Sequence, residues 1–182
     1  MRKAGQSTKF LMDCIAQSLL ERMKKKEYSE ISISEICRHA GVGRTTFYRH
    51  FTANGTKDDV LIYYAASLWS DYCETRKEEV EKDTWGALMN FIYDRKEFFS
   101  AIGNARLEHV LFSIFYKTIG PSEDDIPEIA FFKSFFAGAV FGITYNWIEA
   151  GFVKSPSELT ESIGKIIAAR TVSEPVTAKA EM

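Results

Sequence analysis

Hydrogen-bond donors that can contact nucleic acid are concentrated in one short segment near the start of the chain. The segment contains Arg44, Thr45, Thr46, Tyr48, Arg49 and His50. Such side chains bind phosphate oxygens, and an arginine can also form two hydrogen bonds with the major-groove edge of guanine. If the segment is helical, Thr45 and Arg49 lie on the face opposite Phe47, with the other four donors beside them. The chemistry expected of this face is recognition of base edges and phosphates.

The surrounding sequence predicts the elements that would position these donors. Residues 32–51 read SISEICRHAGVGRTTFYRHF, which indicates two short helices joined by a glycine turn. Ser32 can accept from the backbone of Glu35, whose carboxylate can reach back in a capping box. Gly41 can end the first helix in the left-handed conformation. The second helix would bury Phe47 and turn its donors outward, as in a helix-turn-helix. The alternative is a helical hairpin without a partner.

The charge distribution separates this segment from the rest of the chain. Residues 1–57 hold eleven Lys and Arg against five Asp and Glu, a formal charge of +6. Residues 58–182 hold twelve against twenty, a formal charge of −8. A basic N-terminal third joined to an acidic remainder is typical of a nucleic-acid-binding domain attached to a separate body. The alternative is that solvated helix faces differ in charge by chance.

The composition indicates a packed protein in a reducing compartment. Of 182 residues, 46% are hydrophobic and 14% aromatic, which is enough for a sizeable core. The cysteines Cys14, Cys37 and Cys73 form neither a disulfide framework nor a zinc pattern. The N-terminus lacks the apolar region of a signal peptide, and residues such as Lys133 interrupt the apolar stretches before they reach membrane-spanning length. We therefore expect a cytoplasmic protein without membrane contact.

The sequence contains no pattern typical of catalysis or metal binding. The histidines His39, His50 and His109 have none of the spacings of metal ligands, and no GxSxG nucleophile turn occurs. We therefore expect no metal, no cofactor and no enzymatic activity.

Helical periodicity runs along nearly the whole chain, so the fold class is predicted to be all-α. Helices are expected over about 8–26, 33–40, 44–51, 57–81, 85–99, 105–118, 127–150 and 156–170, with a turn at 52–56. Residues 173–182 show no periodicity and are expected to be disordered.

The segment GVGRTTFYRHF, preceded by SISEICRHA and an amphipathic helix, resembles the N-terminal domain of the TetR (tetracycline-repressor) family of bacterial transcriptional regulators. The resemblance covers about residues 8–62 and implies three helices that bind duplex DNA. It implies a DNA-binding set of Ser32, Gly43, Arg44, Thr45, Thr46, Tyr48, Arg49, His50 and Lys57.

Two positions depart from the family pattern. Gly43 stands where the family usually has a serine, and a glycine caps a helix without a side-chain hydrogen bond. Lys57 follows Phe51 later than the family's lysine does, which indicates a two-residue insertion within 52–56. The match of Lys57 to the family's phosphate-contacting lysine depends on that insertion.

The rest of a TetR-family chain is a helical body that binds ligands and forms dimers. The resemblance therefore implies a helix-turn-helix DNA-binding domain over 1–56 and an effector-binding and dimerisation domain over 57–172. Within the body, WIEAGF at 147–152 followed by SPSEL at 155–159 resembles a subgroup that includes dihydroxyacetone-kinase regulators.

The body is rich in aromatic residues, beyond what a small core requires. Most are expected in the core or in a subunit interface, and the others are candidates for a pocket that binds an apolar or aromatic effector. The candidate effector-binding residues are Phe91, Phe98, Asn104, His109, Phe112, Tyr116 and Tyr145.

The last two long helices are expected to form a dimer interface, because their apolar surface is too large for one small body. Two glycines four residues apart allow another helix to approach closely. The candidate interface residues are Phe131, Phe135, Gly138, Gly142, Leu159, Ile163 and Ile167.

These features and the resemblance predict a homodimeric, ligand-responsive repressor that binds a palindromic operator. A ligand would bias the spacing of the two DNA-binding heads and so change operator affinity. A transcriptional activator or coactivator of the same fold is one alternative. A helical protein-interaction module without DNA binding is another.

Overall fold

A computed structural model describes residues 2–51 and 55–172 of the chain. Within these residues the regular structure consists of ten α-helices and one short 3-10 helix, with no strand. This confirms the all-α prediction. Most of the expected turn at 52–56 and the whole expected tail at 173–182 lie outside the described residues.

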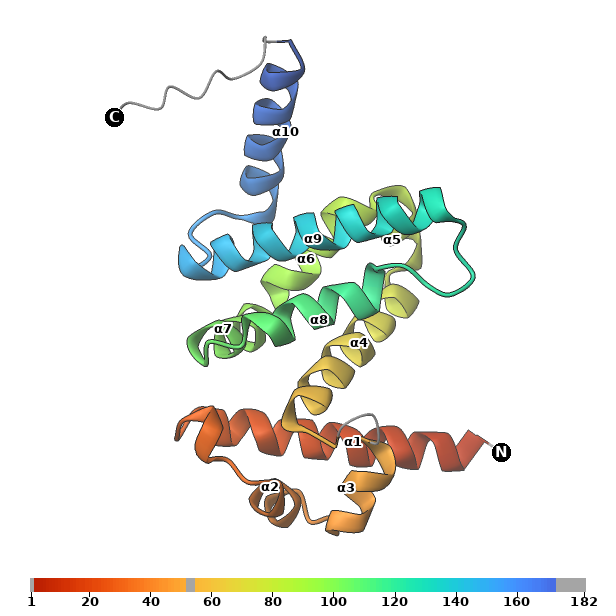
Figure 1. Ribbon diagram of the computed structural model, residues 1–182, viewed down its shortest axis with the longest axis vertical. Helices are drawn as coiled ribbons and strands as arrows, with labels where there is room; N and C mark the ends of the chain where they lie inside the picture. The colour runs from red at the N-terminus through yellow and green to blue at the C-terminus, as the bar shows by residue number, and fades with distance from the viewer. Residues whose placement is uncertain (1, 52–54, 173–182) are drawn as a thin grey trace.

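Three helices form a head at the base of the molecule in Figure 1. They are α1 (Arg2–Met23), α2 (Ile33–His39) and α3 (Arg44–His50), and the 3-10 helix η1 (Tyr28–Glu30) lies between the first two. Fully buried side chains, among them Ile15, Leu19, Ile36 and Phe47, pack the three helices on one another. The predicted amphipathic faces of all three therefore meet in one core. The lysines at 24–26, expected in the last turn of α1, instead follow its end.

The long helix α4 (Lys57–Thr75) rises from the head into a helical body (Figure 1). The body comprises α5 (Lys77–Lys82), α6 (Thr84–Asp94), α7 (Lys96–Asn104), α8 (Glu108–Ile119), α9 (Pro127–Glu149) and α10 (Pro156–Val172). α4 packs on α1 in the head and on α8 in the body, so it touches both parts. α9 lies on α8, and α10 extends away at the end opposite the head (Figure 1).

Two of the predicted body helices are each broken in two. The helix expected over 57–81 ends at Thr75, because Arg76 leaves the helical conformation with φ −125° and ψ 37°. The hydroxyl of Thr75 donates to backbone carbonyls one turn earlier, which competes with the helical hydrogen bonds there. The helix expected over 85–99 is likewise interrupted at Arg95, with φ −112° and ψ 22°. Both breaks fall in charged runs that have little apolar surface to bury.

α9 differs from the expectation that no apolar stretch is long enough to span a membrane. Pro127–Glu149 is long and apolar enough to cross a membrane, judged by length and composition alone. Helices in the core of a globular protein can meet the same criterion. One of its faces is buried against the body through Ala137, Val140 and Trp147. Aromatic side chains on other faces are exposed, which leaves an apolar surface on this helix without cover in the single chain.

Glu35 joins the start of α2 to the end of α1. Its carboxylate lies 3.3 Å from the guanidinium of Arg22 and 2.5 Å from the ammonium of Lys26. The predicted capping box is therefore only half formed: the Ser32 hydroxyl accepts from the Glu35 backbone at 3.2 Å, but the carboxylate turns to α1. The hydrogen bond from Lys26 lowers the pKa of Glu35.

We expect acid to weaken the head through Glu35. A carboxyl group whose pKa is lowered by folding stabilises the fold above its unfolded pKa of about 4.3, and this contribution is lost as the pH falls through the folded pKa. In thermal unfolding followed by circular dichroism, Glu35→Gln should therefore lose less stability below about pH 4.5 than the wild type does. Glu30→Gln, on the neighbouring η1, is the control. An identical acid profile for wild type and Glu35→Gln would contradict this role.

Candidate nucleic-acid interface

α3 turns its hydrogen-bond donors outward because its other face is anchored in the head. Phe47 is fully buried, and Phe51 is 3% exposed. On the opposite side the exposed residues are Arg44, Thr45, Tyr48 and Arg49, with Thr46 and His50 half-buried. The four exposed residues line a shallow hollow of about 580 Å³. Gly41 ends α2 in the left-handed conformation, with φ +69°, as the sequence predicts.

Three neighbours fix the orientation of the Tyr48 ring. It lies edge-on to Phe47, with ring centroids 5.4 Å apart, and the guanidinium of Arg44 lies 6.0 Å from its centroid. A Cβ built on Gly55 would lie 3.1 Å from the ring. Gly55 belongs to the segment where the sequence indicates an insertion. A residue of this segment therefore lies close to the Tyr48 ring of the donor face.

Gly55→Ala is expected to destabilise the head by about 1 kcal/mol, because Gly55 has a left-handed φ of +61°. The new methyl group would also press on the Tyr48 ring. Thermal unfolding would measure the first effect, and operator titration the second. Gly164→Ala, at an exposed position of α10, is the control, since a Cβ there meets nothing within 4 Å. Equal stability of the two variants would contradict a strained position at Gly55.

The two helix caps of the interface differ in kind. The Ser32 side chain caps α2, whereas Gly43 caps α3 in an extended conformation without a side-chain hydrogen bond. Both residues lie at helix N-termini, where free backbone N–H groups can bind phosphate oxygens. The serine that the family usually has at position 43 would add a cap here.

Lys57 lies at the start of α4 and contacts the head. Its ammonium donates to the backbone oxygen of Tyr28 and lies 4.2 Å from the centroid of the Tyr28 ring. Burial lowers the pKa of this lysine. The helix start itself is fixed by a capping box between Thr56 and Asp59. The spacing T-x-x-D could have predicted this cap, but the interaction with Tyr28 has no sequence signal.

Asp58 joins the head, α4 and the body. Its two carboxylate oxygens contact different parts of the protein: Tyr28 Oη donates to one at 2.6 Å, and His109 Nε2 of α8 lies 3.0 Å from the other. Burial raises the pKa of Tyr28. His109, predicted to bind an effector, is thus placed at the junction between head and body.

The other candidate effector residues lie in three different places. Phe91 is 3% exposed and packs against the rings of Trp69 and Tyr72 in the core. Phe98 and Asn104 line two hollows that face α1. The remaining three lie near one another on the surface of α8 and α9: Phe112 stacks on Tyr116 and contacts Phe141, which stacks on Tyr145. The structure therefore does not bring the seven residues together.

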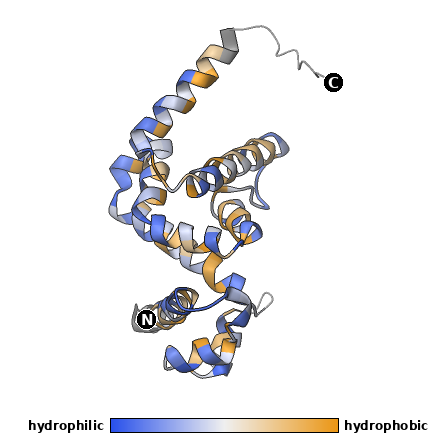
Figure 2. Cartoon of the chain, turned by 90° about the vertical axis from the view of Figure 1, so that its left-hand side faces the viewer, coloured by the Kyte–Doolittle hydropathy of each residue, from blue (hydrophilic) through white to orange (hydrophobic). Residues whose placement is uncertain are grey.

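The candidate dimer residues form two groups. On α9, Phe131 and Phe135 are 76% and 74% exposed, and a Cβ on Gly138 or Gly142 would meet nothing within 4 Å. On α10, Leu159 and Ile163 are half-buried and Ile167 is 62% exposed. Figure 2 shows hydrophobic positions along α10, which extends beyond the rest of the body. An apolar hollow of about 330 Å³ lies between the two groups, at Gly142, Leu159 and Ile163.

Two family models match different parts of this chain. A family model described as "Bacterial regulatory proteins, tetR family" matches residues 19–63, the segment that carries the donor face. A second, "Transcriptional regulator C-terminal region", matches residues 79–169, half of the chain. A comparison with curated protein sequences finds no match. A solved structure named "Dihydroxyacetone kinase operon activator DhaS" is 20% identical, with a TM-score of 0.49 over 91% of this chain and 98% of that one.

The two family models cover both parts of the molecule, and together they confirm the resemblance found in the sequence. The N-terminal family model spans the end of α1 through the start of α4, and the C-terminal family model spans α6 to α9 and most of α10. The chain belongs to the TetR family of bacterial DNA-binding transcriptional regulators.

Proposed function

We propose that the protein is a homodimeric, ligand-responsive repressor that binds a palindromic operator in the cytoplasm. The observation that carries this proposal is the exposed donor face of α3 on a segment of formal charge +6. A basic, convex helix of this size fits the major groove. The rest of the chain carries a formal charge of −8, which disfavours contact with DNA away from the head.

Within this proposal the donors have two kinds of role. Arg49 and Thr45 lie at the centre of the outward face and contact base edges. Tyr48, His50 and Lys57 contact phosphates from its sides, with Arg44 and Thr46 beside them. The N-termini of α2 and α3, at Ser32 and Gly43, offer backbone N–H groups to phosphates. Phosphate contacts set affinity, and base contacts set sequence preference.

The uncovered apolar surface of the body supports a dimer through α9 and α10. Only 17% of the apolar stretch of α9 is buried within the chain. Two glycines on this stripe would let a second helix approach, and Phe131 and Phe135 would lie beside it. A second copy would cover this surface with the same surface of its own, so that each chain makes the same contacts with the other. Such an interface relates the two heads by a two-fold axis. A palindromic operator matches that symmetry. A membrane contact is not needed to cover the surface.

Ligand response would act through α4. This helix starts at the junction of Tyr28, Asp58 and His109 and packs on both the head and α8. A ligand that binds one orientation of the head more tightly than another shifts the population of head spacings, and typical coupling is about 1–3 kcal/mol. Regulators of this family are not enzymes, and we propose no catalytic activity for this one.

Selection of bound sequences from a random duplex pool tests the proposal. We expect enrichment of a palindrome whose half-sites are about one helical turn apart, and binding that weakens steeply as salt rises. Analytical ultracentrifugation should give a dimer, alone and on DNA. A head that enriches no sequence would favour the protein-interaction alternative. Mapping of the selected site against promoters in the source genome would separate repression from activation.

Lys57→Ala is expected to lower the salt dependence of DNA binding by less than one unit. A lysine that contacts a phosphate freely contributes about one unit to the slope of log K against log salt. Lys57 already binds the backbone oxygen and ring of Tyr28, so its ammonium is only partly available. Fluorescence anisotropy across a range of salt concentrations would measure the slope. A full loss of one unit would show that Lys57 leaves Tyr28 when DNA binds.

A further inference from the structure

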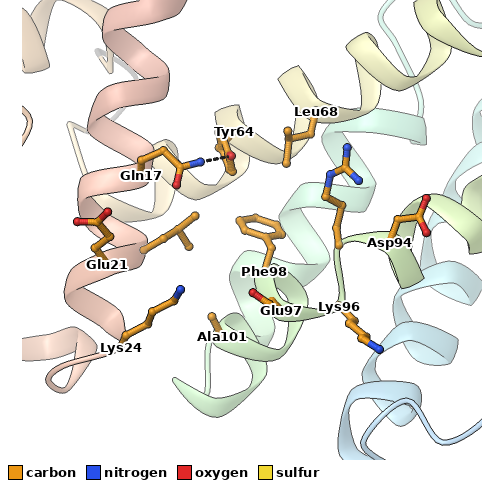
Figure 3. A pocket seen from close by; sticks show the side chains of 12 residues that line it. Gln17, Glu21, Lys24, Tyr64, Leu68, Asp94, Lys96, Glu97, Phe98 and Ala101 are labelled. Atoms are coloured by element: carbon orange, nitrogen blue, oxygen red, sulfur yellow. Dashed lines mark hydrogen bonds between the residues drawn. The ribbon is translucent and has the colours of Figure 1, made fainter.

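Two hollows between the head and the body join into one groove. The first, of about 470 Å³, lies between α1, α4 and α7 (Figure 3). The second, of about 640 Å³, lies between the end of α1 and α7. Both are lined by Lys24, Glu97 and Ala101, so the groove is continuous past these residues. We call it the α1–α7 groove. One of its walls belongs to the DNA-binding head and the other to the body.

The first half of the groove has an apolar floor. Leu20 of α1 lines it, together with Leu68 of α4 and Phe98 of α7, which Figure 3 shows with Tyr64 beside them. The Phe98 ring is 8% exposed and lies edge-on to Tyr64, with centroids 5.7 Å apart. The Tyr64 hydroxyl is already bound by Gln17. This floor offers contact area to a side chain but no free hydrogen-bonding group at Tyr64.

Two opposite charges face each other at the centre of the groove. Lys24 extends from α1 and Glu97 from α7 toward the space between these helices (Figure 3). Within the part of the chain that the structure describes, neither forms an ion pair or a side-chain hydrogen bond. Several other charges that line the two hollows have partners: Glu21 lies 3.3 Å from His39 Nε2, Lys26 lies 2.5 Å from Glu35, and Arg95 and Lys96 lie over the rings of Phe91 and Tyr93. Lys25, Glu27 and Asp94 each line only one of the two hollows, whereas Lys24 and Glu97 line both. Lys24 and Glu97 are therefore available to a ligand.

We propose that the α1–α7 groove binds a small zwitterion with a large apolar side chain, that is, an apolar or aromatic α-amino acid. The carboxylate would pair with Lys24 and the ammonium with Glu97, and the side chain would cover the floor at Leu20, Leu68 and Phe98. Each of the two hollows, of about 470 and 640 Å³, is within the range of small-molecule sites, about 300–1,000 Å³. A ligand with only one of the two charges would desolvate the second protein charge without pairing it, which is unfavourable.

An occupant of this groove would set the angle between head and body. It would touch α1 of the head and α7 of the body at once, and so favour one spacing of these helices. This regulatory consequence rests on the proposed function as a DNA-binding dimer, whereas binding itself does not. By linkage, the factor by which the amino acid changes operator affinity equals the factor by which operator DNA changes amino-acid affinity.

Calorimetric titration of the full-length protein tests the ligand class. We expect saturable 1:1 binding of L-phenylalanine or L-leucine per chain. We expect at least tenfold weaker binding of 3-phenylpropanoate and 2-phenylethylamine, which each lack one charge of phenylalanine. Binding of 3-phenylpropanoate as tight as that of phenylalanine would overturn the zwitterion assignment. A titration in which neither amino acid binds would overturn the proposal.

Charge exchange tests the two residues. Lys24→Glu and Glu97→Lys should each weaken phenylalanine binding at least tenfold, and the double variant should restore it, because the zwitterion can bind in the reverse orientation. Lys117→Glu, an exposed site on α8, is the control for added negative charge. Ala101→Trp should block binding by filling the point where the hollows meet. Unchanged binding in Lys24→Glu or Ala101→Trp would place the ligand elsewhere.

Operator affinity is measured separately, with and without saturating phenylalanine. If the wild type binds its selected site but phenylalanine leaves that affinity unchanged, the groove is a binding site without regulatory effect and the proposed DNA-binding function stands. If phenylalanine binds but no duplex sequence is selected, the groove assignment stands and the proposed function fails.

Discussion

Gly142→Glu is expected to convert the protein into a folded monomer and to lower operator affinity by a factor of about 10³ or more. A Cβ added at this position of α9 meets nothing within 4 Å in the chain, and in the dimer proposed above it would face the second copy. A carboxylate buried in that interface without a partner is strongly unfavourable. A single head retains half of the base contacts, so its affinity approaches that of non-specific binding.

Light scattering and sedimentation would measure the oligomeric state, and circular dichroism would show that helix content is kept. Ser70→Glu, which adds the same charge at an exposed position of α4, is the matched control and should stay dimeric. Ile163→Asp tests the same interface from α10. If both α9 and α10 variants remain dimers, the dimer forms through another surface, and Phe112 and Tyr116 on α8 become the next candidates.

The head could be predicted from the sequence because local signals and burial agree there. The glycine at position 41 ends α2 with the positive φ that its type allows, and Ser32 caps the same helix as the sequence indicates. Phe47 and Phe51 follow a helical spacing and are both buried. Since one face of α3 is fixed by these rings, the outward direction of Thr45 and Arg49 follows from geometry alone.

The helix breaks in the body could not be predicted in the same way. The runs around Arg76 and Arg95 consist mainly of charged residues with good helix propensity, so periodicity continues through them. The break at Arg76 has a local contribution from the Thr75 hydroxyl, whereas the break at Arg95 turns α7 so that Phe99 and Ile102 reach the core. This is a tertiary effect, which a local pattern does not contain.

The contacts between head and body also lack a sequence signal. Tyr28, Asp58 and His109 are separated by 30 and 51 residues along the chain and meet only after folding. The same holds for Lys24 and Glu97 in the α1–α7 groove. The number of aromatic residues did not locate a pocket for the same reason. Phe91 is buried in the core and Phe112 is exposed on the surface, although both are phenylalanines in similar helical patterns.

Arg49→Ala is expected to weaken binding to the preferred operator about 5- to 150-fold, which corresponds to about 1–3 kcal/mol. Arg49 is exposed at the centre of the α3 face, and no ion pair or hydrogen bond occupies its side chain among residues 2–51 and 55–172. It can therefore form both hydrogen bonds to a guanine. Its loss should also relax discrimination at one base position in each half-site, while binding to unrelated duplexes falls much less.

Two further variants separate base recognition from simple charge. Arg49→Lys keeps the charge but lacks the planar pair of donors, so it should retain the salt dependence and still lose discrimination at that position. Arg44→Ala, on the same helix and beside the Tyr48 ring, should weaken all duplexes to a similar extent. Competition between the selected site and its single-base variants would measure both effects. If Arg49→Ala also weakens every duplex equally, Arg49 contacts a phosphate, and sequence preference must come from Thr45 and Thr46 or from the shape of the DNA.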